Sequence, residues 1–155
     1  MYLNQLISNL SDKGLMKKEK IGPDQVQKHL DRAHEDLKVA AANLTIDGEA
    51  SYNYAYLAML RTGRALMLLE GYRPIDGAQH KTVIEFASAV LGKKYRELAE
   101  EFDEMRQRRN KFTYEPGAPV STLEAQEAIK IAKEWVKEVS RIMAKRNPQL
   151  RLFQD

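Results

Sequence analysis

The chain has 155 residues, of which 43% are hydrophobic and 30% are charged, and its formal net charge is +3. This length suits one domain with its own core, and this composition excludes wholesale disorder. The absence of cysteine excludes disulfides and thiolate metal sites, and no apolar run approaches the roughly 18 residues of a membrane span, so we expect a cytoplasmic protein with no membrane partner.

Helical periodicity runs through almost the whole sequence, and almost no segment alternates as a strand does. Pro23 suits the first turn of a helix, Asp47 is a candidate N-cap, and Ser121 with Glu124 forms a candidate capping box. The helices expected from these signals span about residues 2–10, 23–43, 48–70, 78–90, 94–113 and 122–146. Five or six helices with short connections predict an all-α, antiparallel up-and-down bundle.

The sequence divides into a helical core and two short ends. We expect a single domain over residues 1–155, with its core at about 24–146 and a tail at 147–155. Residues 1–22 are expected to form a short helix and a linker, in which the charged run 17–20 is solvated.

The third expected helix is apolar on all sides. A helix of this kind is either central in its bundle or covered by another subunit. For a chain of this size we favour the second explanation, a homodimer through this helix.

A cationic residue interrupts the apolar face of the fifth expected helix. Steps of three or four residues place the following six side chains on one face: Tyr95, Leu98, Phe102, Met105, Arg109 and Phe112. The guanidinium of Arg109 must find a partner, reach solvent from the edge of the face, or line a wet cleft.

Other polar residues also stand on apolar faces. Asn53 and Arg64 share a face of the third helix, and His80 lies one turn before Val83 on the fourth. If these helices are neighbours, Arg64 and Arg109 could converge on one anion, such as a phosphate. The densest cationic cluster beside an aromatic residue consists of Arg106, Arg108, Arg109 and Lys111.

Several kinds of site are poorly supported by the sequence. His29 and His34 are five residues apart and do not share a helix face, so no metal site is expected. Phosphate-loop and dinucleotide glycine motifs are absent, as is a nucleophile elbow, and we expect no cofactor. The acidic run over residues 97–104 is expected to be a solvated helix face.

Three segments in a fixed order resemble a known family. They are the aromatic-rich run from Ala50 to Leu66 with its AYLAM and RAL elements, Gly71-Tyr72-Arg73-Pro74 followed by Gln79–Ile84, and the dipeptide Arg109-Asn110 late in a long helix. In this order they resemble the HEPN domain, the nucleotide-binding domain of higher eukaryotes and prokaryotes. The resemblance covers about residues 24–145.

This resemblance implies an all-α bundle that commonly forms homodimers. Many members are metal-independent endoribonucleases, often toxins encoded beside a minimal nucleotidyltransferase. Their motif is an arginine followed after four to six residues by a histidine. Arg109 and Asn110 match its start, but Tyr114, Glu115 and Pro116 stand where the histidine is expected. Tyrosine is a poor base at neutral pH.

The leading hypothesis is a dimeric HEPN-like protein that binds RNA or nucleotide phosphate, as part of a toxin–antitoxin or nucleotidyltransferase-linked system. Its candidate catalytic residues are Arg109, Asn110, Tyr114 and His80, and its candidate phosphate-binding residues are Arg64, Arg108 and Lys111. Any cleavage would be a metal-free internal transesterification, in which Arg109 stabilises the phosphorane and His80 or Glu115 handles the proton.

Two other hypotheses stay open. One is a non-catalytic module that docks a minimal nucleotidyltransferase through exposed aromatic residues such as Tyr52, Tyr56 or Phe153. The other is a structural dimerisation domain in which Arg109 pairs with Glu101 or Asp103.

Overall fold

The structure is a computed structural model that describes residues 2–75, 79–117 and 119–151. Its described residues form the six helices α1 (Tyr2–Asp12), α2 (Pro23–Asn43), α3 (Gly48–Leu69), α4 (Gln79–Leu91), α5 (Arg96–Tyr114) and α6 (Thr122–Arg146), and a short 3-10 turn, Lys93–Tyr95. The predicted all-α bundle is therefore confirmed. Ala78, the expected first residue of the fourth helix, lies outside the described residues. None of the helices described is long and apolar enough to cross a membrane.

Two helix starts carry the caps that the sequence predicts. The Asp47 side chain accepts hydrogen bonds from the backbone N–H groups of Glu49 and Ala50 at the start of α3. At the start of α6, Ser121 Oγ accepts from the Glu124 N–H at 3.1 Å. The reciprocal half of the capping box is missing, because the Glu124 carboxylate binds Arg108 instead.

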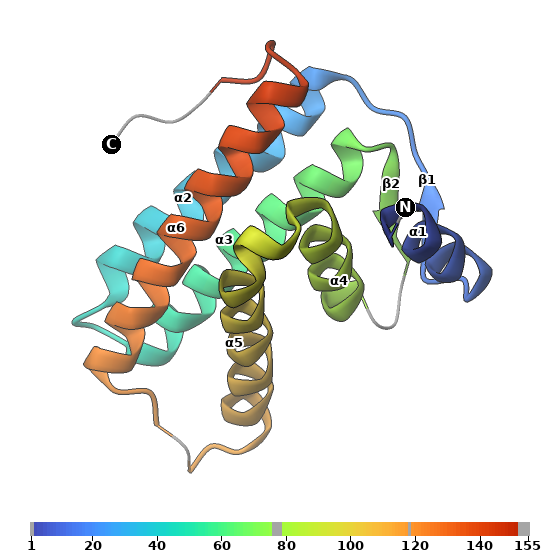
Figure 1. Ribbon diagram of the computed structural model, residues 1–155. Coiled ribbons are helices and arrows are strands. Elements are labelled where there is room, and N and C mark those ends of the chain that lie inside the picture. Colours follow the sequence, from blue (N-terminus) through green and yellow to red (C-terminus); the bar gives the residue numbers. More distant parts are fainter. Residues whose placement is uncertain (1, 76–78, 118, 152–155) are drawn as a thin grey trace.

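Helix α3 lies at the centre of the bundle, between α2, α4, α5 and α6 (Figure 1). Its residues Tyr56, Met59 and Leu66 are fully buried, and Trp135 Nε1 of α6 donates a hydrogen bond to the Met59 carbonyl. The central position accounts for a helix that is apolar on all sides. The packing of α3 therefore gives no reason to place a dimer interface on it, and the homodimer stays a prediction.

Helices α3 and α4 approach closely at Gly63. A Cβ atom on this residue would lie 2.5 Å from Cγ1 of Val83, which is fully buried. The missing side chain lets the start of α4 lie against α3.

A two-stranded antiparallel sheet joins the N-terminal segment to the α3–α4 connection. Strand β1 (Met16–Lys18) pairs with β2 (Tyr72–Pro74), with Lys17 opposite Arg73. Lys17 and Lys18 are exposed, as expected of the charged run 17–20, but they lie in a strand and not in a linker. Strands of three residues are too short to show alternation, and one buried side chain, Met16, anchors this one to the core.

The apolar face of α5 is confirmed. Leu98, Phe102, Met105 and Phe112 are buried, and Arg109 between them is half-buried. In the first turn of α6, Leu123 is 70% exposed.

Candidate functional site

The side chain of Tyr56 is the centre of a polar cluster between α3, α4 and α5. Its ring is fully buried, and its hydroxyl shares a hydrogen bond of 2.9 Å with Nδ1 of His80, the second residue of α4. Burial raises the pKa of Tyr56, so the hydroxyl keeps its proton at neutral pH. Because a phenol both donates and accepts, it can fix either neutral tautomer of His80.

Arg109 reaches the same tyrosine from α5. Its Nε donates to Asn53 Oδ1 at 2.7 Å, and its Cζ lies 5.5 Å from the centroid of the Tyr56 ring. An amide oxygen and an aromatic face hold this guanidinium without neutralising it. The hypothesis of a carboxylate partner for Arg109 is wrong for Asp103, which accepts from Arg106 Nε at 2.8 Å instead. No ion pair joins Arg109 to any carboxylate among the described residues.

Arg64 joins the cluster from α3. Its Nη2 donates to Oε1 of Gln79 at 2.7 Å, so it holds the first residue of α4 directly beside His80. Its Nε is buried and has no hydrogen-bond partner within the part of the chain that the structure describes. Burial, followed by the charge of Arg61, lowers the pKa of Arg64.

The electrostatic environment of His80 is strongly positive. Burial, followed by the charges of Arg109, Arg64 and Arg106, lowers the pKa of His80 to about 4. The imidazole is therefore neutral at pH 7. Of these three arginines only Arg106 forms an ion pair with a described carboxylate. An anion bound beside His80 would offset this charge and raise its pKa.

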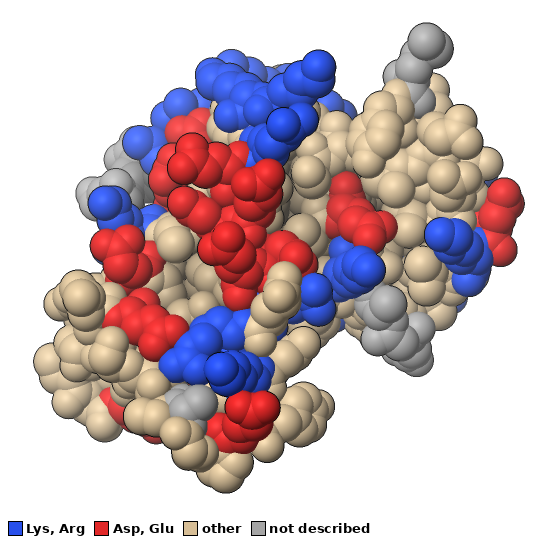
Figure 2. Space-filling model, turned by 60° about the horizontal axis from the view of Figure 1, so that its bottom comes forward, with Lys and Arg blue, Asp and Glu red and all other residues tan. Residues whose placement is uncertain are grey.

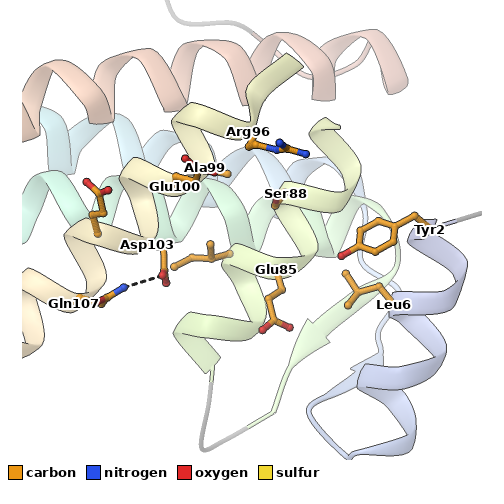
Figure 3. Close-up of a pocket in the computed structure, with 11 residues that line it drawn as sticks. Tyr2, Leu6, Glu85, Ser88, Arg96, Ala99, Glu100, Asp103 and Gln107 are labelled. Carbon is orange, nitrogen blue, oxygen red and sulfur yellow. Dashed lines mark hydrogen bonds between the residues drawn. The ribbon is translucent and has the colours of Figure 1, made fainter. Parts of the chain in front are cut away.

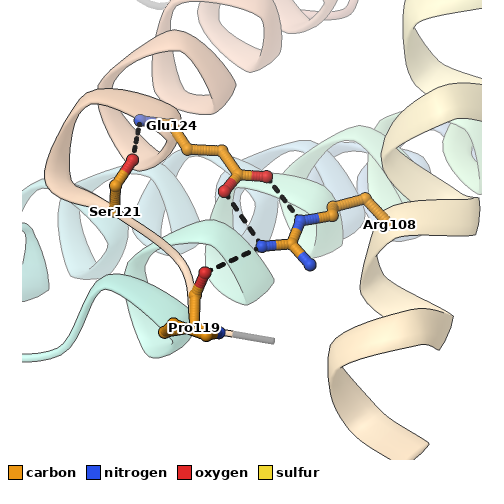
Figure 4. A network of polar contacts seen from close by, with 4 residues as sticks. All are labelled: Arg108, Pro119, Ser121 and Glu124. Carbon is orange, nitrogen blue, oxygen red and sulfur yellow. Dashed lines mark hydrogen bonds and ion pairs between the residues drawn. The ribbon is translucent and has the colours of Figure 1, made fainter. Parts of the chain in front are cut away.

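Four of the expected site residues lie elsewhere. Asn110, Lys111 and Tyr114 are exposed at the end of α5, and no described contact brings them to His80. Arg108 points to α6, where Nε and Nη2 donate to Glu124 at 2.5 and 3.0 Å and Nη2 also donates to the Pro119 carbonyl (Figure 4). Of the predicted residues, the structure thus brings together His80, Arg109 and Arg64.

Two members of the cluster were not predicted in these roles. The sequence indicates Asn53 only as a polar residue on an apolar face, and it offers Tyr56 as part of an exposed docking surface. That assignment is wrong, because Tyr52 and Tyr56 are both buried. Phe153, named with them, lies outside the described residues. The spacing Asn53–Tyr56 was the available signal, since three residues is close to one helical turn and aims both side chains at one neighbour.

Two hollows of the described surface are lined by more carboxylates than cations, which does not suit phosphate. The larger, about 500 Å³, lies between α1, α4 and α5, and its walls include Glu85, Glu100 and Asp103 (Figure 3). The smaller, about 270 Å³, lies between α5 and α6 and is lined by Glu101 and other glutamates. Burial and neighbouring glutamates raise the pKa of Glu101. Figure 2 shows acidic side chains gathered in the middle of one face, with basic side chains on both sides.

The described residues contain no group of three or more histidines and carboxylates that could hold a metal ion. The cluster around Tyr56 brings the guanidinium groups of Arg109 and Arg64 to a neutral histidine, an arrangement that suits an anion.

The family profile of the HEPN domain matches residues 26–142. The chain belongs to the HEPN domain family. The resemblance seen in the sequence is thereby confirmed, and it indicates a function related to nucleotides or RNA in general. No curated protein and no solved structure matches the chain. The matched residues of this HEPN protein include every member of the cluster around Tyr56 and exclude α1 and β1.

Proposed function

We propose that this HEPN protein binds the phosphodiester backbone of RNA at Arg109, Arg64 and His80. The observation that carries the proposal is the convergence of two arginines without described carboxylate partners on a neutral histidine. Arginine is suited to phosphate because its planar donors bind two oxygens at once. Among the described residues, Arg109 donates a side-chain hydrogen bond only from Nε, to Asn53, so its terminal nitrogens can donate to a ligand.

The proposal is tested by binding of a labelled single-stranded RNA in excess EDTA, comparing wild type with Arg109→Ala. We expect about tenfold weaker binding, from the loss of charge-assisted hydrogen bonds, and a slope of log K against log salt smaller by about one. The control is Arg141→Ala, a half-exposed arginine of α6 that pairs with Glu138. Equal losses in both variants, or none in Arg109→Ala, would contradict the site.

A neutral imidazole beside Arg109 also favours cleavage as a second function. In this proposal His80 Nδ1 donates to the Tyr56 oxygen, and Nε2 takes the proton of the RNA 2′-hydroxyl. The 2′ oxygen bonds to phosphorus, the bond to the 5′ oxygen breaks, and that oxygen takes a proton from water. Arg109 stabilises the charge of the phosphorane. A product ending in a 2′,3′-cyclic phosphate, formed in EDTA and absent with His80→Gln, is the expected result. Binding without that product would leave a binding module only.

We further propose a homodimer that acts in the cytoplasm, in a toxin–antitoxin or nucleotidyltransferase-linked system with a minimal nucleotidyltransferase as its partner. Large apolar side chains are exposed at one end of the bundle: Ile46 beside the start of α3, Leu123 at the start of α6 and Tyr114 at the end of α5. The first two flank the close approach of Gly48 to the Val120 carbonyl. Light scattering during gel filtration tests the dimer, and Leu123→Asp should shift it toward the monomer.

The alternative of a non-catalytic docking module rests on the same exposed end. If wild type neither binds nor cleaves RNA, this end of the bundle becomes the first place to seek a protein partner.

A further inference from the structure

The segment before α2 binds the connection between the two helices that form the site. Strand β1 pairs with β2, and further backbone hydrogen bonds extend this pairing at both ends. Ile75 N–H donates to the Leu15 carbonyl at 2.9 Å, and Glu19 N–H donates to the Gly71 carbonyl at 2.9 Å. Residues 71–75 are thus held along their whole length by residues 15–19.

Side chains anchor this segment on both sides of β1. Leu10 at the end of α1 and Met16 in β1 belong to the buried core. Leu6 of α1 faces the hollow that Ile84 of α4 also lines (Figure 3). On the outer face, Arg73 Nε forms an ion pair of 2.8 Å with Glu19. The segment therefore contacts both the connection and α4.

The connection precedes His80 closely in the sequence. Strand β2 follows α3, which carries Tyr56 and Arg64, and Ile75 is five residues before His80. Among the described residues β1 is the sole strand partner of β2. An unpaired strand edge leaves its backbone groups to solvent and gives the chain freedom to move. Without β1, residues 71–75 would lose the backbone partners that residues 15–19 supply.

We propose that residues 15–19 are positioning residues for His80, because their pairing with residues 71–75 fixes where α4 begins relative to Tyr56. The proposal rests on the proposed function only for its effect on RNA, since the position of His80 is measurable without a ligand. It assigns a role to a part of the chain that lies outside the matched residues 26–142.

The test opens the strand pair in the full-length chain. Lys17 is exposed and lies opposite Arg73. This pair is midway between the hydrogen bonds Ile75–Leu15 and Glu19–Gly71, so Lys17 occupies a hydrogen-bonded position of the antiparallel pair. Lys17→Pro removes its N–H donor, and Lys17→Ala is the matched control that keeps it. Amide hydrogen exchange reports whether the pair opens, and the NMR titration of the His80 imidazole reports its position among Tyr56, Arg64, Arg106 and Arg109.

We expect Lys17→Pro to speed amide hydrogen exchange at residues 71–75. The His80 pKa should rise by about one unit, because burial and the arginines then act less on it. RNA binding should weaken about tenfold. Lys17→Ala should match wild type in all three. Faster exchange with an unchanged His80 titration would overturn the proposal, because β1 would then act on stability alone. Ile129→Val in the core of α6, a destabilising change away from β1, should leave the His80 titration as in wild type.

Two further outcomes separate the proposals. If Lys17→Pro does not fold, Lys18→Gly replaces it, because a glycine in β1 weakens the strand pair more mildly. Faster exchange at residues 71–75 in Lys18→Gly with an unchanged His80 titration would overturn the proposal. If wild type does not bind RNA but the His80 titration follows the strand pair, the proposed function fails and the positioning role stands.

Discussion

At the scale of single residues, the chemistry of the site depends on how charge is arranged around His80. Its hydrogen bond goes to a neutral phenol, and the charges that lower its pKa are arginines, with burial as the larger cause. A carboxylate in the place of Tyr56 would favour the imidazolium. The free protein therefore keeps His80 neutral, and the positive charge around it favours a bound anion.

This arrangement predicts a pH dependence of stability. The folded pKa of His80, about 4, is lower than the 6.5 of an unperturbed histidine. Between these values the unfolded chain binds a proton that the folded chain does not, so this contribution to stability is complete above pH 6.5 and is lost as the pH falls toward 4. Urea unfolding measures the free energy of unfolding at pH 7 and at pH 4.5. Between these two values His80→Gln should lose less of it than wild type does.

The exposed neighbour Lys81 provides the control, since Lys81→Gln should lose as much stability as wild type over the same interval. Identical losses in all three proteins would show that His80 is not held in its neutral form by the fold. The pKa of His29 is also lowered, first by burial and then by Arg64 and Arg61. His29 should therefore cause part of the loss of stability at low pH in every variant.

At the scale of elements, α2 and α3 are joined by a buried charge. Asp36 of α2 is fully buried, and its Oδ2 accepts from Arg61 Nε of α3 at 2.5 Å. Arg32, one turn away on α2, lies 3.4 Å from the other oxygen and is half exposed. Burial raises the pKa of Asp36, and Arg61 is the main influence that lowers it.

Removing Arg61 should lower the free energy of unfolding far more than removing the more exposed Arg32. Arg61→Ala leaves the buried Asp36 carboxylate with only the half-exposed Arg32 beside it, and we expect a loss of about 3 kcal/mol in the free energy of unfolding. Arg32→Ala should lose less than about 1 kcal/mol, because exposed ion pairs contribute little. Chemical denaturation of the two variants measures the difference, and equal losses would contradict the assignment of Arg61 as the structural partner.

The helices could be predicted from the sequence, but the contacts between them could not. Asp47 and Ser121 mark helix starts through local hydrogen bonds, so neighbouring residues suffice to predict them. The pairing of Lys17 with Arg73 joins residues far apart in the chain. Neither strand is long enough to be predicted from an alternating pattern.

The same limit explains the partial prediction of the site. Arg109, Arg64 and His80 each stand out on their own helix, and the sequence indicates them. The burial of Tyr56 and the turn of Arg108 toward Glu124 depend on where α4 and α6 pack, which no local pattern contains.

At the scale of the whole molecule, the net charge of +3 hides a strong separation of charge. The first half of α5 is acidic and lines both hollows, whereas its second half carries Arg106, Arg108 and Arg109. An RNA backbone approaching the site would be attracted at the second half of α5 and repelled along the first. Helix α1 of the N-terminal segment packs against α4, and β1 of the same segment pairs with β2, the strand that precedes His80 in the sequence.

The most direct test of this account is an NMR titration of His80 in the wild-type protein, without and with a short single-stranded RNA whose 2′-hydroxyls are methylated to prevent cleavage. We predict a pKa of about 4 in the free protein and a rise of about one unit or more when the phosphate binds, because the anion offsets Arg64 and Arg109. A His80 titration that the RNA leaves unchanged, at concentrations that saturate the protein, would contradict the assignment of this cluster as the phosphate site.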